Sequence, residues 1–315
     1  MARPLWLVIV LLFQALSASA RDEGPVTIER PFLWEFWEPG SRVTSYLFGT
    51  IHVNDPNITK LHPAVLSAFG SASAVWFEID FVKDNVVQTR AVSLPPGRHL
   101  ESLIPKSAVG RIDRRLKKLS PLLTRNVLPE FRVVMWPLVL ANLEAQMSRP
   151  GTAPMDMQLQ MSAGEAGKKT GGLEDPSRQL QPLLDLSIEK QIEFLEASLD
   201  MMDADDAGGI HPLEQLVKIY ASGDSHALQE YLLQEINRPE MSEDLKTLLI
   251  ETLLIRRNAR MVRAIVANLK AEPGEVHFVA VGTAHLLGKE SVVEGLREAG
   301  FTVRRVSVTD EHKKE

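Results

Sequence analysis

The apolar and polar positions of residues 43–80 predict a strand, a polar corner, a helix and a second strand. The apolar run at 46–48 ends at the tetrapeptide GTIH, residues 49–52. Apolar residues then recur at helical spacing as far as Phe69. A second apolar run at 74–77 ends at Glu78, so the unit finishes on a carboxylate.

The same arrangement returns near the carboxyl end of the chain. An apolar run at 276–281 breaks at GTAH, residues 282–285, and a helical stretch and a strand at 301–308 follow. A half-unit used twice predicts that both copies belong to one sheet. We therefore predict an α/β fold with a mixed sheet built from two related strand–GTxH–helix–strand halves.

Most of the chain between the two copies has helical spacing. This pattern predicts a large helical insertion at 98–270 within an α/β core formed by 30–82 and 274–309. We expect a single domain over 21–310, followed by a polar tail at 311–315.

Three further stretches bear on the fold and the site: residues 32–37, residues 164–172 and the long helix that begins near Ser242. Aromatic and acidic residues alternate at 32–37 before a turn, which predicts a β-hairpin. The glycine- and lysine-rich residues 164–172 predict a helix end and a loop. Ser242 is expected to cap a long helix. Arg257 falls inside the apolar register of that helix, so we expect it to be partly buried beside an anion or a carboxylate.

The N-terminus has the pattern of a secretory signal peptide. Arg3 precedes an apolar run at 5–16, and Ala18-Ser19-Ala20 fits an A-x-A site, so we predict cleavage after Ala20. The run is short for a membrane span, and an uncleaved anchor is the alternative. The chain has no cysteine, which favours a bacterial periplasm over a disulfide-rich secretory route. We expect a periplasmic or secreted protein with no stable membrane span after cleavage.

Composition and charge narrow the class of partner. With 44% hydrophobic and 24% charged residues, the 315-residue chain has an ordinary globular composition. Its formal net charge is −6, and it carries no basic stripe with interleaved aromatic residues. Nucleic acid is therefore not expected as a partner. A small molecule or a peptide is the expected substrate, and oligomeric state is left open.

The two corners place candidate chemistry at equivalent positions. Loops that leave the carboxyl ends of strands in open α/β sheets line the ligand crevice. His52, His285 and Glu78 would then form a two-histidine, one-carboxylate set, which suits zinc, manganese, iron or cobalt rather than calcium. Glu78 could instead act as a general base toward water. Both histidines could also be hydrogen-bonded corner residues, and Glu78 a strand-end salt bridge.

The motifs resemble those of the TraB/GumN family, which belongs with the Tiki proteases and is more distantly similar to erythromycin esterases and haem-binding ChaN proteins. The resemblance covers about residues 32–308. It rests on YLFGTIHV at 46–53, FEID at 77–80, DxxL and GKxxxxLE within 156–174, RN at 257–258 and VAVGTAHL at 279–286. The sequence departs from the family at Gly171-Gly172, where relatives have an apolar, strand-like stretch.

The resemblance implies a site at His52, Glu78 and His285, with Arg257 nearby as a further catalytic residue. Asp156 and Glu174 are interpreted as structural, and either could pair with Arg257. The leading hypothesis is an exported, metal-dependent hydrolase of peptide or other acyl bonds. The alternatives are a periplasmic binding protein for haem, a peptide signal or a polysaccharide fragment, and a metal-independent esterase.

Overall fold

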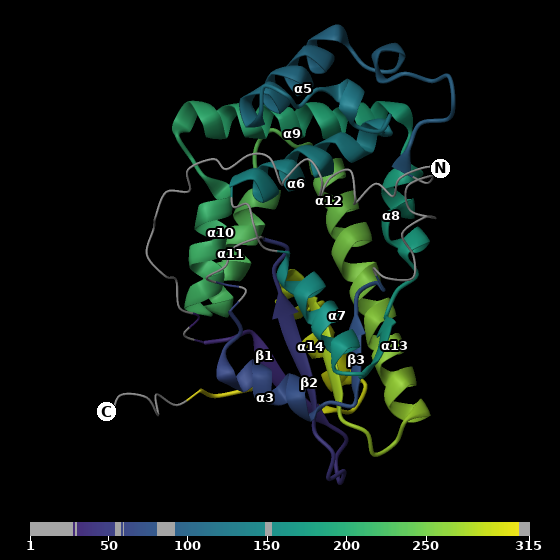
Figure 1. Cartoon of the computed structure of the whole chain (residues 1–315), viewed down its shortest axis with the longest axis vertical. Coiled ribbons are helices and arrows are strands. Elements are labelled where there is room, and N and C mark those ends of the chain that lie inside the picture. Colours follow the sequence, from purple (N-terminus) through teal and green to yellow (C-terminus); the bar gives the residue numbers. More distant parts are fainter. Residues whose placement is uncertain are drawn as a thin grey trace.

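A computed structural model describes residues 28, 30–53, 58, 60–80, 92–148 and 153–308. The predicted signal peptide at 1–20 and the polar tail at 311–315 lie outside these residues. Figure 1 shows a sheet at one end of the molecule and a layer of helices beyond the carboxyl ends of its strands.

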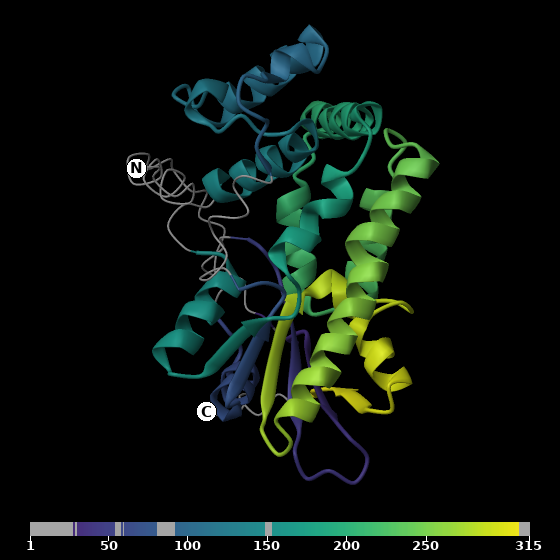
Figure 2. The same cartoon turned by 90° about the vertical axis from the view of Figure 1, so that its right-hand side faces the viewer.

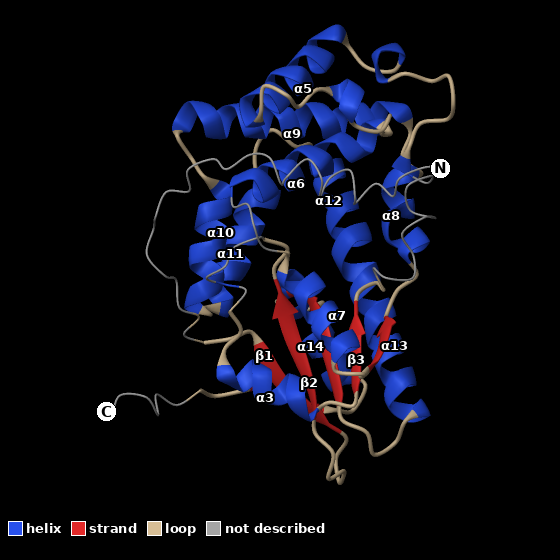
Figure 3. Cartoon of the chain, in the orientation of Figure 1, coloured by secondary structure: helices blue, strands red, loops and turns tan. Residues whose placement is uncertain are grey.

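Within the described residues, six strands form one mixed sheet in the order β4-β3-β5-β2-β1-β6 (Figure 3). Their bounds are β1 Leu33–Trp37, β2 Ser45–Thr50, β3 Ala74–Phe77, β4 Lys169–Gly172, β5 His277–Gly282 and β6 Thr302–Arg305. Neighbouring strands from β4 to β2 are parallel, whereas β1 is antiparallel to both β2 and β6. The predicted mixed α/β sheet is confirmed.

The two sequence copies are adjacent in this sheet, as predicted. Strands β2 and β5 pair in parallel, with Gly49 opposite Val281 and Thr50 opposite Gly282. Strand β3 pairs with the other side of β5. Because the three strands run in the same direction, both GTxH corners and the end of β3 reach the same edge of the sheet.

The predicted hairpin is also present, because β1 and β2 are antiparallel neighbours. The turn between them includes Gly40, whose φ of 87° is readily adopted by glycine. Trp34 is buried on β1 and belongs to the apolar core around the sheet.

Helices cover both faces of the sheet (Figure 2). One face carries α13 (Arg256–Ala271) and α14 (Val292–Glu298), which pack together. The other carries α7 (Met155–Glu165), which contacts β3 and β4. Helix α3 (Pro63–Ser71) connects β2 to β3 and contacts β2. The sheet is therefore the centre of one apolar core.

The insertion is helical, as predicted, and part of it has an apolar core of its own. Besides α7 and α13, the described residues of the insertion form α5 (Lys106–Leu119), α6 (Trp136–Ser148), α8 (Pro176–Leu184), α9 (Ile188–Gly208), α10 (Pro212–Ser222), α11 (Ser225–Ile236) and α12 (Glu243–Ile250). Helices α5, α6 and α9 bury Leu116, Trp136 and Leu195 in this second core. Helix α10 instead joins the sheet core through Val217 and Tyr220.

The predicted loop at 164–172 is wrong in its second half, because Lys169–Gly172 forms edge strand β4. Two glycines give no alternation of side chains, so the strand left no apolar signature in the sequence. Space for the Trp76 ring explains Gly171, where a Cβ would lie 2.6 Å from Trp76 Cζ3. At Gly172 a Cβ would lie 3.0 Å from the backbone nitrogen of Asp80. Close packing against β3 therefore replaces the apolar side chains of a typical strand.

The long helix begins where expected. Ser242 accepts a hydrogen bond from the Leu245 N–H, 3.3 Å away, and caps α12. Between α12 and α13 lies a π-helical turn, η4 (Glu251–Ile255). This turn was not predicted, because the apolar residues from Leu245 to Leu269 keep an approximately helical spacing across it. It ends at Ile255, one residue before the pair Arg257 and Asn258.

Candidate functional site

The site lies where β2, β5 and β3 end. His52 follows β2, His285 lies in the 3₁₀ turn η5 (Thr283–Leu286) after β5, and Glu78 follows β3. Since β5 is the middle strand of the three, the second corner stands between the first corner and the glutamate. Residues far apart in the chain thus meet at one sheet edge.

The glycine of each motif leaves space for a group from another strand. A Cβ on Gly49 would lie 2.7 Å from Thr283 Oγ1. That hydroxyl donates to the Thr50 carbonyl at 2.8 Å and so ties the second corner to the first. A Cβ on Gly282 would lie 3.1 Å from Glu78 Oε1, 3.7 Å from His285 Cδ2 and 3.9 Å from His52 Nε2. The three candidate side chains therefore converge on one point beside Gly282.

His52 is the more accessible histidine, with 58% of its side chain exposed. Its Nδ1 lies 3.0 Å from Asp156 Oδ2 on α7. Burial alone lowers the pKa of His52, but the hydrogen bond and charge of Asp156, with the charge of Glu78, outweigh that effect. The net result raises the pKa of His52 to about 9.

Glu78 is almost enclosed and is held by three hydrogen-bonding or ion-pairing neighbours. Its Oε1 accepts from the Gly282 N–H at 2.6 Å. Its Oε2 accepts from Gln179 Nε2 at 3.3 Å and is ion-paired with Arg257. Burial by itself would raise the pKa of Glu78, but His285, Arg257, His52 and the Gly282 N–H together hold it at about 2. Glu78 is therefore ionised near neutral pH.

His285 is buried, with 4% of its surface exposed. Its Nδ1 lies 2.6 Å from Asn258 Oδ1, and its Nε2 lies 3.8 Å from Glu78 Oε1. Burial lowers the pKa of His285 to about 4, because the nearby Glu78 carboxylate only partly offsets the loss of water and the charges of Arg257 and His52 add to the lowering. The ring is therefore neutral near neutral pH.

Arg257 is buried as expected and lies between two carboxylates. Its Nε donates to Glu174 Oε2 at 2.7 Å, and its Nη2 contacts Glu78 Oε2. Arg260, one turn further along α13, donates to the other oxygen of Glu174 at 3.0 Å. A glutamate whose side chain is 1% exposed is thus paired with two guanidinium groups, and one of those groups fixes Glu78.

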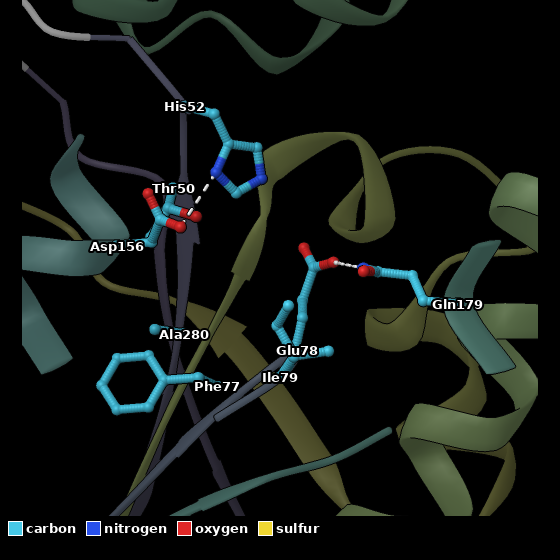
Figure 4. Close-up of a pocket in the computed structure, with 8 residues that line it drawn as sticks. All are labelled: Thr50, His52, Phe77, Glu78, Ile79, Asp156, Gln179 and Ala280. Carbon is cyan, nitrogen blue, oxygen red and sulfur yellow. Dashed lines mark hydrogen bonds and ion pairs between the residues drawn. The ribbon is translucent and has the colours of Figure 1, made fainter. Parts of the chain in front are cut away.

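A small cavity of about 140 Å³ opens between these groups. Figure 4 shows the His52 ring and the Glu78 carboxylate facing the same space, with Asp156 beside the histidine and Gln179 beside the glutamate. Phe77 and Ala280 form the apolar part of its wall, and Thr50 contributes a hydroxyl-bearing side chain. The cavity has room for a small functional group rather than for a whole large ligand.

No group of three or more histidine, cysteine, aspartate or glutamate side chains has metal-binding geometry within the described residues. The chemistry of the donors nevertheless fits a borderline divalent ion. His52 and His285 each direct Nδ1 to an oxygen of a neighbouring residue and leave Nε2 toward Glu78. Metal-binding histidines usually have such a hydrogen-bond partner on the ring nitrogen that does not bind the metal. These donors meet beside Gly282.

The insertion contributes contacts to the site that sequence patterns did not reveal. Asp156 was interpreted as structural, yet it contacts His52. Gln179 on α8 and Asn258 on α13 were not predicted as site residues. The only indication in the sequence of a site role for Asn258 is that it follows Arg257 within the RN motif. Nothing in the sequence marked Gln179, because a lone glutamine on an amphipathic helix is common.

The fold and the paired corners define a class of α/β protein whose site lies at the carboxyl edge of the sheet and is completed by helices of an insertion. The TraB/PrgY/gumN family model matches residues 32–305. The chain therefore belongs to this family, which confirms the resemblance read from its motifs.

Curated relatives carry the name metalloprotease. The chain is 27% identical to Metalloprotease TIKI2 of Danio rerio over 95% of its own length and 67% of that protein. It is 25% identical to Metalloprotease TIKI1 of Danio rerio, over 91% of this chain and 65% of the relative. It is 24% identical to Metalloprotease TIKI1 of Homo sapiens, over 82% of this chain and 59% of the relative. The chain thus spans about two thirds or less of these relatives.

No solved structure matches the chain. Among the helices that the structure describes, none combines the length and apolar character needed to cross a membrane.

Proposed function

We propose that the protein is an exported, metal-assisted hydrolase of peptide or other acyl bonds. The observation that carries this proposal is the convergence of His52, Glu78 and His285 within 4 Å of one point beside Gly282. The metalloprotease names of relatives that align over most of the chain support it.

The residues proposed to hold the ion are His52 and His285 through Nε2, with Glu78 as a third ligand or as the base. Because the raised pKa leaves the His52 ring protonated near neutral pH, binding the ion through its Nε2 would release that proton. When bound, a first-row divalent ion supplies Lewis acidity to the substrate carbonyl. Manganese, cobalt, zinc and iron all accept imidazole and carboxylate ligands, so the chain does not select one of them by ligand type.

Glu78 is suited to accept a proton from the attacking water. It is ionised, it borders the cavity, and the Gly282 N–H and Arg257 fix its two oxygens. Because the donors of Arg257 face Glu78, Glu174 and the Leu253 carbonyl, we assign Arg257 the task of orienting Glu78. Glu78 and Glu174 are carboxylate partners of the kind expected for a buried Arg257.

Metal dependence is tested by elemental analysis after equilibrium dialysis. We expect a stoichiometric ion in the wild type and its loss in His52→Ala and in His285→Ala. His226→Ala is the matched control, because its side chain is 81% exposed and lies on α11, away from the cavity. Turnover by a protein that binds no ion would instead support the metal-independent esterase.

Catalysis is tested with a panel of peptides and esters in the presence of each of the four ions. Glu78→Gln should lower kcat/KM by roughly 10²–10⁴-fold, the usual contribution of a general base, while substrate affinity persists. Ligand affinity without turnover under every ion would favour the binding protein. Circular dichroism of the variant separates loss of chemistry from loss of fold.

Export is a separate part of the proposal and rests on the N-terminal pattern. N-terminal sequencing of the protein recovered from the periplasm or medium should begin at Arg21. Protein retained with the membrane fraction and still carrying Met1 would support the uncleaved anchor.

A further inference from the structure

Asn258 is buried beside His285 and makes two hydrogen bonds through its amide. Its Nδ2 donates to the backbone carbonyl of Glu290 at 2.7 Å, and its Oδ1 lies 2.6 Å from His285 Nδ1. Only 5% of Asn258 and 4% of His285 is exposed. Water therefore has little access to replace either contact.

The orientation of this amide follows from its partners. A backbone carbonyl only accepts hydrogen bonds, so the amide nitrogen must face Glu290 and the amide oxygen must face the ring. The ring nitrogen next to that oxygen must then be the donor. His285 Nδ1 consequently carries the proton, and in the neutral ring Nε2 has a bare lone pair.

The π-helical turn gives Asn258 its direction. In an α-helix successive residues are about 100° apart, and an extra residue in η4 (Glu251–Ile255) shifts the register of everything that follows. Arg256 comes directly after this turn and is exposed, whereas the next two residues, Arg257 and Asn258, are both buried toward the site. Arg257 Nη1 also lies 3.5 Å from the Leu253 carbonyl within the turn. Turns of this kind often occur at functional sites.

We propose that Asn258 is a positioning residue that holds His285 as the Nδ1–H tautomer and so presents an unprotonated Nε2 to Glu78 and the cavity. This inference deepens the proposed function and depends on it for its significance, since a bare Nε2 matters only if His285 serves the site. The hydrogen-bond logic itself is independent of any substrate.

The tautomer is measured by long-range ¹⁵N–¹H correlation spectra of the histidine rings in the full-length, metal-free protein near neutral pH. The His285 ring is assigned from the signals that disappear in His285→Gln. We expect a protonated Nδ1 and a bare Nε2 in the wild type. A wild-type spectrum with the proton on Nε2 would overturn the proposal.

Two substitutions separate positioning from structural support. In Asn258→Asp an oxygen still faces the ring, so the Nδ1–H signal should persist even though the bond to Glu290 is lost. In Asn258→Ala no acceptor remains, and Nε2–H signal should appear. Arg263→Ala, exposed on the same helix, should leave the spectrum unchanged. A folded Asn258→Ala protein that keeps the wild-type spectrum would contradict the proposal.

Failure of this inference and failure of the proposed hydrolase are distinguishable. The spectrum reports the proton position whether or not any substrate is turned over. Should Asn258→Ala not fold, the wild-type spectrum still decides the question, because it has a definite expected tautomer, and Asn258→Asp should keep the Nδ1–H signal.

Discussion

The two GTxH corners have the same motif but different surroundings. His52 is largely exposed at its side chain and faces the Asp156 carboxylate, which favours the charged ring. His285 is buried and faces the Asn258 amide, which leaves the ring neutral. The repeated motif thus determines the position of each histidine in the fold, whereas the side chain that a neighbouring helix places against the ring determines the charge of the ring.

Glu78, which lies beside the second corner, depends on one buried cation, Arg257. Replacing Arg257 by methionine removes the buried guanidinium that pairs with Glu78 and Glu174. Because an uncompensated buried charge is costly, we expect the free energy of unfolding to fall by roughly 3–5 kcal/mol. Denaturant unfolding measures this loss. The neighbouring Arg256→Met, which changes an exposed side chain, is the control and should stay within about 0.5 kcal/mol of wild type. Equal effects of the two substitutions would show that the buried cation is not needed.

The motif glycines should respond differently to the same added methyl group. Gly49→Ala drives a Cβ against Thr283 Oγ1 and, at 3.0 Å, the Phe32 Cβ, so we expect it to cost about 1–3 kcal/mol of stability. Gly282→Ala meets Glu78 Oε1 at 3.1 Å, so its main effect should be on turnover.

Both glycine variants are compared by thermal unfolding and by kcat/KM on the same preparations. Gly164→Ala is the control, because a Cβ there meets nothing within 4 Å. If Gly282→Ala destabilised the fold as much as Gly49→Ala while keeping full turnover, the distinction between the corners would fail.

A smaller effect is expected from the bond that joins the corners. Thr283→Val keeps the shape of the side chain but removes the donor to the Thr50 carbonyl, which should cost about 0.5–1.5 kcal/mol. Thr302→Val on β6, an exposed position, controls for replacing a strand threonine by valine. The difference between the two variants in denaturant unfolding gives the contribution of the cross-corner bond, and no difference would count against it.

The smallest expected effect on stability is that of Asp203, an exposed carboxylate that serves as a comparison for the buried Glu78. Burial would raise the pKa of Asp203, but hydrogen bonds from Arg115 and Arg111 lower it overall. A lowered pKa stabilises the fold above about pH 4, the unfolded value, and this contribution is lost as pH falls through the folded-state value. Because half of the Asp203 side chain is exposed, solvent screening limits its contribution to about 0–1 kcal/mol.

Unfolding of Asp203→Asn and wild type across this pH range measures that contribution. The free energies of unfolding of the two proteins should differ slightly at pH 7 and become equal at acidic pH. A difference that grows as the pH falls would have the wrong sign for a lowered pKa.

Sequence patterns predicted the parts of the molecule that depend on local spacing. Strand β3 was expected at 74–77 and is found at Ala74–Phe77, and the repeated motif correctly predicted that both corners share one sheet edge. Strand β4 was missed because its glycines carry no alternating pattern. Asp156, Gln179 and Asn258 come from three separate helices whose orientations depend on tertiary packing and, for Asn258, on a π-helical turn. Local spacing in the sequence does not predict those orientations.

The origin of these neighbours has a consequence for how such a protein can diversify. The segments that directly follow three strands carry the proposed reacting groups, while α7, α8 and α13 supply Asp156, Gln179 and Arg257. Point changes in the helices can therefore adjust acidity and geometry without disturbing strand pairing. Reactivity in such a fold can change through substitutions in the insertion while the three strands keep their positions.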